Sequence, residues 1–258
     1  MITASVVSHG HGDMVRRLVA RLLECPEVSK IVVTLNIPEN LALPESAQVE
    51  VIRNPAPLGY GANHNQAFRQ SVGDFFCVLN PDIALPENPF GRLLGILRET
   101  DADISAPRVL SPQGKAEDSV RRFPTLPGLL AKALRLSDGR IHFDAASAPF
   151  CPDWFAGMFM LFRRGAYARL GGFDEKFFLY YEDVDLCVRA WNQGMKIVVC
   201  PSAFVTHDAR RDSHRHPRHL RRHLASMARY FWKYLGRLPT ISLKSDASAS
   251  SSSYSRII

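Results

Sequence analysis

Five carboxylates lie among aromatic residues in one short segment of the chain. Residues 171–189 read GGFDEKFFLYYEDVDLCVR, and the acids at positions 182, 183 and 185 stand where a helix is expected to begin. Carboxylates beside apolar surface are partly desolvated, which raises their basicity toward the range of a general base. The alternative is a favourable pairing of these acids with the positive end of the helix dipole. The aromatic flank at 177–181 favours the catalytic interpretation.

Another candidate acid follows an apolar run earlier in the chain. Residues 75–82 read FFCVLNPD, so Asp82 stands at the carboxyl end of an expected strand. Mg²⁺ and Mn²⁺ prefer a few carboxylates plus oxygens of a phosphorylated substrate. The alternative is an ordinary turn, because Asn, Pro and Asp all favour turns. One acid that holds a cation and another that takes a proton would suit chemistry on a phosphorylated substrate.

A segment rich in Gly and Asn connects an expected strand to an expected helix. Residues 54–65 read NPAPLGYGANHN. Gly59 and Gly61 would let the backbone approach a ligand, and the helix N-terminus would favour an anion. A plain loop with a helix cap at Asn63 explains the same residues equally well. The spacing matches neither a Rossmann nor a P-loop fingerprint, so nothing supports NAD or ATP binding.

Histidines follow two expected strands. His207 comes after the strand expected at 203–206 and could complete a cation site with Asp82, although a lone histidine is more often structural than a ligand. Residues 8–13 read SHGHGD and follow the first expected strand. Their glycines permit a close backbone approach to a ligand.

The elements that must position these residues alternate through the first half of the chain. Expected strands lie at 4–8, 30–35, 49–53, 74–79 and 104–108, and expected helices at 13–23, 63–71 and 89–99. This βαβ rhythm indicates an α/β domain with a mostly parallel sheet and helices on both faces. Ligands bind beyond the carboxyl ends of the strands in such sheets. The candidate site positions are therefore 8–13, 36–39, 54–65 and 80–82.

The second half is less regular. Residues 111–152 contain several prolines and are expected to form an irregular excursion that shapes an acceptor site. The patterns then predict strands at 155–163, 196–200 and 203–206, the second ended by Pro201, and helices at 164–170 and 183–193. A last helix at 217–235 carries an apolar stripe made of Leu220, Leu224, Met227, Phe231 and Leu235. The Ser-rich tail from 242 is expected to be disordered.

Charge and cysteine content narrow the class of protein. The formal net charge is +7, and residues 207–237 carry this excess with nine Lys or Arg against two Asp. An anionic partner should therefore meet the C-terminal end. The chain has no apolar run long enough to span a bilayer, and its N-terminus lacks the basic region of a signal peptide. The five cysteines lack the spacing of a zinc site and are expected to be reduced and mostly buried, which indicates a cytoplasmic protein.

Four separated segments together resemble the family 2 glycosyltransferases with a GT-A fold, especially the bacterial rhamnosyltransferase-like branch. They are 54–65, LNPD at 79–82, WFAGMFM at 154–160, and 171–189. The last follows the family pattern Gly-Gly-Phe-Asp-Glu, Phe-Phe, then Glu-Asp-x-Asp-Leu-x-x-Arg. The order and spacing of these segments agree over roughly residues 1–210.

The resemblance implies an inverting transfer from a sugar nucleotide, with Mg²⁺ or Mn²⁺ on the diphosphate. It implies Asp183 as the base, with Glu182 as the alternative, and it implies a cation held by Asp82 and His207. From their places after the strands and in the loop at 54–65, the residues expected around the donor are Ser8, His9, Asn36, Glu39, Asn54, Gly59, Gly61, Asn63, Asn80 and Asp82. Trp154 and Gly157 would border the sugar and acceptor pocket.

Two departures from the family pattern leave the donor open. Family members commonly end the second strand with Asp-Asn, whereas this chain continues Asn36-Ile37-Pro38-Glu39. The loop at 8–11 also replaces a more usual Asn-containing loop. The donor could therefore be a dTDP- or a UDP-sugar, such as dTDP-rhamnose, and the acceptor a growing surface polysaccharide or a lipid-linked glycan.

The expected organisation is a glycosyltransferase domain at 1–210, a basic amphipathic helical extension at 211–241 and a disordered tail at 242–258. Basic residues can bind an anionic leaflet, so a peripheral contact of 211–237 with the inner face of the cell membrane is one interpretation of the extension. Packing of its apolar stripe on the domain is the other.

Two rival functions are a sugar-nucleotide-forming nucleotidyltransferase and a basic nucleic-acid-binding protein. A nucleotidyltransferase would be expected to have a loop with Lys or Arg after its first strand, but residues 8–13 contain neither. A nucleic-acid-binding function would leave the acids at 174–185 without a purpose, so no nucleic-acid partner is expected.

Overall fold

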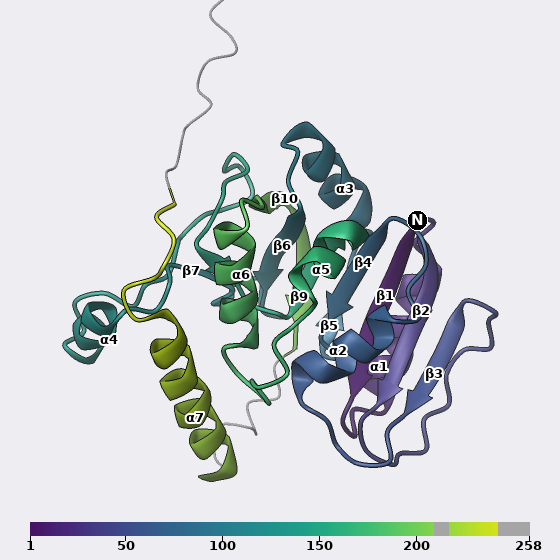
Figure 1. Ribbon diagram of the computed structural model, residues 1–258. Helices are drawn as coiled ribbons and strands as arrows, with labels where there is room; N and C mark the ends of the chain where they lie inside the picture. The colour runs from purple at the N-terminus through teal and green to yellow at the C-terminus, as the bar shows by residue number, and fades with distance from the viewer. Residues whose placement is uncertain (209–216, 242–258) are drawn as a thin grey trace, which may run out of the picture.

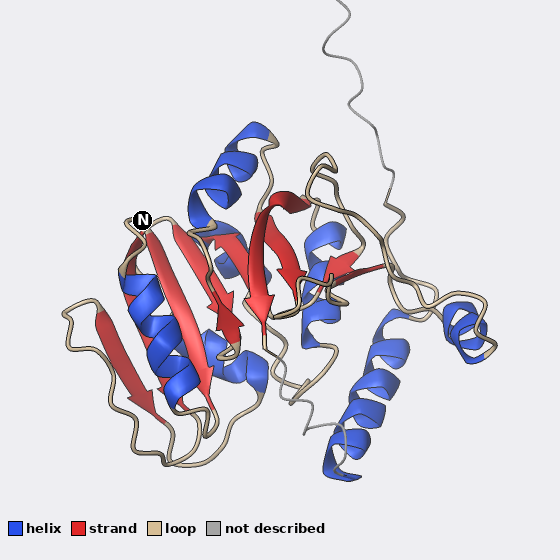
Figure 2. Cartoon of the chain, turned by 180° about the vertical axis from the view of Figure 1, so that it is seen from behind, coloured by secondary structure: helices blue, strands red, loops and turns tan. Residues whose placement is uncertain are grey.

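An eight-stranded mixed sheet runs through the centre of the protein, with helices on both of its faces (Figures 1 and 2). The computed structural model describes residues 1–208 and 217–241 of the 258-residue chain. The strand order is β3-β2-β1-β4-β9-β6-β10-β5. The expected α/β class is confirmed.

The first half of the sheet is parallel, as its sequence pattern predicts. It consists of β1 (Ile2–Ser8), β2 (Val28–Leu35), β3 (Val49–Arg53) and β4 (Phe75–Leu79). Every residue of β1 and β4 is buried, because helices cover both faces. The connecting helices are α1 (Asp13–Leu23) and α2 (Tyr60–Phe68). All four strands therefore end at one edge of the sheet.

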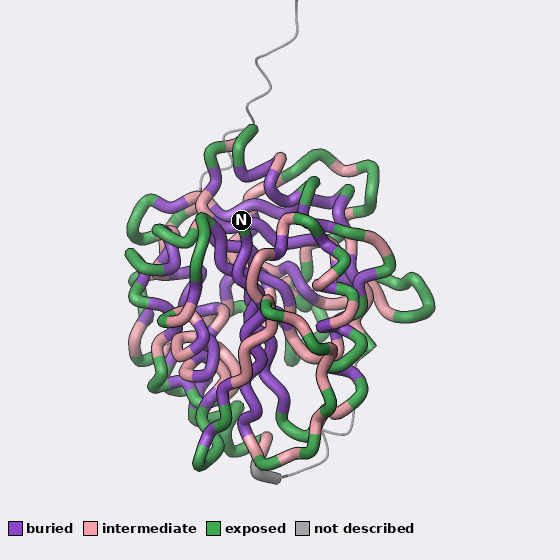
Figure 3. The backbone as a smooth tube through the Cα atoms, turned by 90° about the vertical axis from the view of Figure 1, so that its right-hand side faces the viewer, coloured by how far each residue is buried: buried purple, intermediate pink, exposed green. Residues whose placement is uncertain are grey.

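The second half of the sheet mixes directions. Strand β9 (Phe159–Arg163) runs antiparallel between β4 and β6 (Ile104–Leu110), β10 (Ile197–His207) is parallel to β6, and β5 (Ile83–Ala84) pairs antiparallel with β10. The helices here are α3 (Phe90–Glu99), α5 (Arg164–Leu170) and α6 (Glu182–Asn192). Figure 3 shows that buried positions run through the interior of the protein and that exposed positions lie mainly at its periphery.

Two local predictions are wrong for identifiable reasons. The strand expected to end at Pro201 continues as β10 to His207. Its pairing with β6 is irregular between Cys200 and Phe204, and a proline is tolerated at such an irregularity. Helix α2 begins at Tyr60 with Gly59 as its N-cap, so Asn63 lies inside the helix and does not cap it.

The excursion expected at 111–152 contains short elements. Strand β7 (Val120–Arg121) pairs with β8 (Trp154–Phe155), and α4 (Leu126–Ala133) projects from the side of the domain (Figure 1). The hydroxyl of Thr125 caps α4 by accepting a hydrogen bond from the backbone N–H of Gly128, with an N–O distance of 3.0 Å.

Two apolar layers form the core, one on each face of the sheet. Helices α1 and α3 pack on one face, and α2, α5 and α6 on the other. Four of the five cysteines are buried in these surroundings and none of the five forms a disulfide, as expected.

The C-terminal helix α7 (Pro217–Tyr234) packs on the same face as α6, but of the predicted stripe only Phe231 packs against the core. Its buried side chains are Ser226, Tyr230 and Tyr234, whereas Leu220, Leu224 and Leu235 are exposed. The expected tail at 242–258, and residues 209–216, lie outside the described residues.

Candidate active site

The carboxyl ends of β1, β2 and β4 open into a cavity of about 1150 Å³, called the larger cavity here. Its walls include five residues predicted from the sequence as donor contacts: His9, Asn36, Asn63, Asn80 and Asp82. The parallel arrangement brings them together because the strands that precede them end at the same edge.

Asp82 and His207 form a pair at this edge of the sheet. His207 Nε2 lies 3.1 Å from Asp82 Oδ2. Burial, the largest influence on His207, lowers its pKa, but the hydrogen bond to Asp82 and its negative charge outweigh burial, so the pKa is raised. The remaining atoms, Asp82 Oδ1 and His207 Nδ1, are buried and have no hydrogen-bond partner in the described part of the chain.

This pair fits a divalent cation that takes most of its ligands from a substrate. Buried polar atoms are normally satisfied, so the two unpartnered atoms mark where a ligand or cation is expected. The described residues contain no cluster of three or more His, Cys, Asp or Glu that could hold a metal without further ligands. Mg²⁺ typically binds through one or two protein carboxylates plus substrate phosphates. The expected roles of Asp82 and His207 are compatible with this geometry.

A second cavity of about 600 Å³, called the smaller cavity here, contains the acidic segment. Glu182, Asp183 and Trp154 line it, together with Tyr181 and Asp153. Tyr180 lines both cavities, so the two meet at this side chain.

Asp183 is held by backbone donors at both carboxylate oxygens. Oδ2 accepts a hydrogen bond from the N–H of Gly157 over 2.9 Å, and Oδ1 accepts one from the N–H of Val184 over 2.8 Å. Burial raises the pKa of Asp183, and these N–H groups oppose that rise by stabilising the charged form. The result is an oriented carboxylate of raised basicity at the wall of the smaller cavity.

Glu182 has the opposite environment. It is only 6% exposed, and its Oε2 has no hydrogen-bond partner among the described residues. Burial, followed by the charge of Asp183, raises its pKa well above the usual value. Of the two acids, Glu182 therefore has the environment that favours the protonated form, whereas the two N–H donors of Asp183 favour its charged form.

The backbone before this pair is unusual. Tyr180 and Tyr181 have φ values of 70° and 67°, in the left-handed region that bulky residues rarely adopt. Such residues cost roughly 1–3 kcal/mol each and persist only where packing over-determines them. Here the Tyr181 ring lies 5.2 Å from that of Tyr230, and the Tyr180 ring 5.3 Å from that of His223. Contacts with α7 thus support the turn that presents Glu182 and Asp183.

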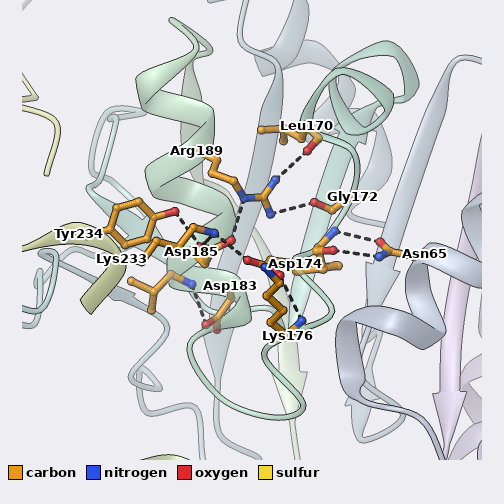
Figure 4. A network of polar contacts seen from close by, with 12 residues as sticks. Asn65, Leu170, Gly172, Asp174, Lys176, Asp183, Asp185, Arg189, Lys233 and Tyr234 are labelled. Atoms are coloured by element: carbon orange, nitrogen blue, oxygen red, sulfur yellow. Dashed lines mark hydrogen bonds and ion pairs between the residues drawn. The ribbon is translucent and has the colours of Figure 1, made fainter. Parts of the chain in front are cut away.

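Asp185, which the sequence suggests is a support of the helix, anchors α7 (Figure 4). Its carboxylate is fully buried and accepts hydrogen bonds from Arg189 Nε, Lys233 Nζ and the Tyr234 hydroxyl, at 2.7, 2.6 and 2.7 Å. Asp174 accepts a further bond from Lys233 at 2.7 Å. A buried carboxylate with three donors is satisfied, so Asp185 has a structural role.

The side-chain amides of Asn36, Asn54 and Asn63 form a buried hydrogen-bond network. Asn36 accepts from the N–H of Leu58 over 2.8 Å and donates to its carbonyl over 3.0 Å. Asn54 donates to Asn36 over 3.0 Å and to Asn63 over 2.6 Å. The network fixes the path of residues 54–59 at the rim of the larger cavity, where Pro57 and Leu58 line the wall.

The two loop glycines serve a packing purpose that the sequence did not reveal. A Cβ on Gly59 would lie 2.8 Å from the carbonyl oxygen of Phe178, and one on Gly61 would lie 2.4 Å from Cβ of Phe173. The close approach is therefore to the acidic segment and not to a ligand. It joins two of the four motifs directly.

Five predicted donor residues do not line the larger cavity: Ser8, Glu39, Asn54, Gly59 and Gly61. Ser8 is fully buried, and its Oγ accepts a hydrogen bond from the N–H of His11 over 3.3 Å. Glu39 accepts bonds from the N–H groups of Gly10 and Gly12, both at 3.3 Å. Both side chains shape the loop after β1. Gly157 likewise does not line the smaller cavity and contributes through its bond to Asp183.

Several cavity residues were not named individually as site residues from the sequence. The hydroxyl of Tyr60, a residue within the candidate segment 54–65, donates to the carbonyl of Gly157 over 2.5 Å, and Tyr60 lines the larger cavity. Burial is the main cause that raises the pKa of Tyr60 well above its usual value, and negative charge on the neighbouring acids adds to this rise, so Tyr60 remains a donor. His219 and Arg222 of α7 line the same cavity, and the Arg222 guanidinium lies 4.2 Å from the Phe178 ring centroid. The only sequence signal for these two was the basic helix.

Sheet and site together define a class of enzyme, one that transfers a group from a phosphorylated substrate at the ends of parallel strands. The chain belongs to glycosyltransferase family 2, because the model of the family described as "Glycosyltransferase like family 2" matches residues 5–229. It is therefore an inverting glycosyltransferase of the hexosyltransferase type. The resemblance of the four sequence motifs is confirmed.

Two relatives of this chain are named rhamnosyltransferases. The chain is 29% identical to rhamnosyltransferase WbbL of Escherichia coli (strain K12), over 89% of this chain and 92% of the relative. It is 30% identical to N-acetylglucosaminyl-diphospho-decaprenol L-rhamnosyltransferase of Mycobacterium tuberculosis (strain ATCC 25618 / H37Rv), over 66% of this chain and 62% of the relative. The chain thus spans less than two thirds of the mycobacterial protein.

Solved structures share the fold. GalNAc-T7 with UDP, GalNAc and Mn²⁺ matches with a TM-score of 0.65 and 16% identity, over 82% of this chain and 44% of that one. Mannosyltransferase PcManGT from Pyrobaculum calidifontis, in complex with GDP-Man and Mn²⁺, matches with a TM-score of 0.57 and 16% identity, over 88% and 64%. The GT-A fold expected from the sequence is confirmed.

Proposed function

We propose that the larger cavity binds the nucleotide-sugar donor and that the smaller cavity binds the acceptor hydroxyl. The observation that carries this proposal is the meeting of the two cavities at Tyr180, with Asp82 on one side and Asp183 on the other. An acceptor in the smaller cavity would meet a carboxylate oriented by two N–H groups. The anomeric carbon of a donor bound in the larger cavity would face it.

Asp183 would remove the proton of the acceptor hydroxyl as the oxygen attacks the anomeric carbon. General-base catalysis of this kind contributes roughly 10²–10⁴-fold to a rate. Glu182, protonated and buried, would keep a second negative charge away from the attacking oxygen. Tyr60 would hold the Gly157 peptide and, through it, the orientation of Asp183.

Asp82 and His207 would hold Mg²⁺ or Mn²⁺ against the donor diphosphate. When bound, the cation would neutralise charge that builds up on the leaving nucleotide. Arg222 and His219 of α7 face the same cavity and would add positive charge near the diphosphate. The structural relatives that contain Mn²⁺ support a divalent cation without identifying it.

The donor that fits the relatives best is a rhamnose nucleotide. The WbbL and mycobacterial relatives are named rhamnosyltransferases. The choice between a dTDP- and a UDP-sugar rests on the loops at 8–13 and 36–39, which differ from the family pattern. We therefore propose dTDP-rhamnose first, with a UDP-sugar as the alternative.

For the acceptor we propose a surface polysaccharide or a lipid-linked glycan. The named acceptor of the mycobacterial relative is a diphospho-decaprenol glycan. A cytoplasmic enzyme with a peripheral contact at the inner membrane face, made through residues 211–237, suits that substrate. Among the described residues, no helix is long and apolar enough to cross a bilayer.

A donor screen tests the proposal. Purified protein would be mixed with dTDP-rhamnose, UDP-hexoses and GDP-mannose, with and without Mn²⁺, and thermal stabilisation would be measured. Transfer to synthetic lipid-linked and short-chain glycan acceptors would then be followed by mass spectrometry. Product whose new linkage has the inverted anomeric configuration is expected. The absence of both donor binding and transfer with every sugar nucleotide would reject the proposal.

A further inference from the structure

Exposed apolar side chains are concentrated on two neighbouring helices. Of the twelve large hydrophobic side chains that are exposed in the described part of the chain, eight belong to α4, the turn after it, and α7 with its following residue. Each of the eight is at least 48% exposed, and Trp232 is 91% exposed. They are Leu126, Leu130, Leu134, Leu136, Leu220, Leu224, Trp232 and Leu235.

Helix α4 contributes nothing to the core of the domain. None of its residues is buried, although five of the eight are Leu or Ala that could pack. Isolated helices shorter than about 12–15 residues are marginal in water, and most helical stability comes from packing an apolar face. An eight-residue helix that leaves its leucines in solvent therefore has an unused packing face.

The charge around these side chains has a single sign. Residues 124–137 and 217–241 contain no Asp or Glu. Lys132 and Arg135 follow the leucines of α4, and Arg221, Arg229 and Arg237 are exposed on or just after α7. Apolar side chains interleaved with cations and an exposed Trp are the composition of surfaces that lie in the headgroup region of a bilayer.

The two helices also stand beside the proposed acceptor site. Both line the smaller cavity, α4 through Gly128, Leu129 and Lys132, and α7 through His223 and Met227. The Tyr230 hydroxyl donates to the carbonyl of Pro124 over 3.2 Å, which ties α7 to the entry of α4. Figures 1 and 2 both show α4 and the C-terminal end of α7 side by side, on the flank opposite β3.

We infer that α4 and α7 form a membrane-docking surface, defined by these eight side chains and the exposed cations, that rests on an anionic lipid bilayer. Docking there would bring the mouth of the smaller cavity to the leaflet, where a lipid-linked acceptor has its head group. The inference rests on the proposed function only for the acceptor. Binding to the bilayer itself depends on the surface alone.

Vesicle flotation tests the inference with the full chain. The probes are vesicles of phosphatidylcholine and vesicles that contain about one third phosphatidylglycerol. The wild-type protein is expected to float with the anionic vesicles at least about tenfold better than with the neutral ones, and less well at high salt. The double variant Leu130→Glu/Leu134→Glu, whose positions do not line either cavity, is expected to lose about tenfold or more of this binding.

A matched control and a second variant keep the test decisive. Val72→Glu changes an equally exposed apolar residue between α2 and β4, and should float like the wild type. Arg135→Glu/Arg221→Glu removes charge without touching the leucines, and should also weaken flotation. Thermal unfolding would verify that each variant is folded.

Three results would overturn the inference. The first is that the wild-type protein floats with neither kind of vesicle. The second is equal flotation of the wild type and both double variants. The third is a dimer in solution that Leu130→Glu/Leu134→Glu dissociates, which would assign the surface to a second copy of the chain. The absence of donor binding and of transfer with every sugar nucleotide would reject the proposed function without affecting flotation, so the two failures are distinguishable.

Discussion

The backbone N–H of Gly157 donates to Oδ2 of Asp183 over 2.9 Å, and this contact joins the WFAG motif to the proposed base. On the other side of the same residue, the Tyr60 hydroxyl donates to the Gly157 carbonyl over 2.5 Å. A Cβ at position 157 would lie 3.2 Å from the Tyr60 hydroxyl oxygen and 3.5 Å from Cβ of Asp183. A side chain here would crowd the Tyr60 hydroxyl, whereas its distance to Asp183 is an ordinary contact.

Removing the Tyr60 hydroxyl should change the environment of Asp183 indirectly, through the Gly157 peptide. A hydrogen bond to a peptide carbonyl polarises the peptide and strengthens its N–H as a donor. Tyr60→Phe should therefore weaken the Gly157–Asp183 bond and raise the pKa of Asp183, so that the acid limb of the rate profile for transfer moves to higher pH. The rate at the optimum should fall by about tenfold, the loss of roughly 1.4 kcal/mol of transition-state stabilisation. An unshifted acid limb would show that Tyr60 does not act through Asp183.

Asp82 should control the metal dependence of donor binding. Asp82→Ala removes the only carboxylate of the proposed cation site, and should weaken Mn²⁺-dependent donor binding by about tenfold or more. Isothermal titration of the sugar nucleotide with and without Mn²⁺ measures this change. The control is Asp208→Ala, an exposed acid beside His207, which should retain the Mn²⁺ effect. A Mn²⁺ response in Asp82→Ala equal to that of the wild type would remove Asp82 from the site.

Gly61 should be intolerant of a side chain for steric reasons. Its missing Cβ would lie 2.4 Å from Phe173 Cβ, in a packed region. Gly61→Ala should destabilise the fold by about 1–3 kcal/mol. Gly165→Ala is the matched control, because nothing lies within 4 Å of a Cβ there and helical Ala is more stable than Gly by about 0.5–1 kcal/mol. Urea unfolding that gives both variants the same stability would contradict the proposed packing between the two motifs.

The Asp185 carboxylate should hold α7 on the domain. Asp185→Ala leaves Arg189, Lys233 and Tyr234 without their shared acceptor. Loss of one partner of a buried ionic network typically costs about 3–5 kcal/mol, which for a domain of this size lowers Tm by roughly 10 °C. Asp138→Ala, an exposed acid paired with Arg140, is the comparison and should leave Tm unchanged. Equal Tm values for the two variants would show that this anchor is dispensable.

Much of the catalytic edge could be predicted from the sequence because strand ends are local features. Asn36, Asn80 and Asp82 follow apolar runs, and a parallel sheet brings such positions to one edge. The acids of the 171–189 segment were recognisable for a similar reason, since an aromatic flank beside a helix start is visible in the chain itself.

Contacts between distant segments could not be predicted in the same way. Gly59 and Gly61 have the composition of a ligand loop, yet their missing side chains make room for Phe178 and Phe173. The periodicity of α7 marks the leucine stripe as apolar, but the side chains that pack are Tyr230 and Tyr234, because they reach polar partners at Pro124 and Asp185. Of the predicted stripe, Leu220, Leu224 and Leu235 stay exposed, whereas Phe231 packs against the core.

The central claim, that Asp183 is the base and Glu182 is not, is tested most directly by comparing two isosteric variants. Transfer rate and donor affinity would be measured for Asp183→Asn and Glu182→Gln under the same conditions. Asp183→Asn is expected to lose about 10²–10⁴-fold in transfer rate while its donor affinity stays near that of the wild type. Glu182→Gln, which mimics the protonated side chain, should retain most of the rate. A Glu182→Gln enzyme that is inactive beside an active Asp183→Asn enzyme would contradict the account.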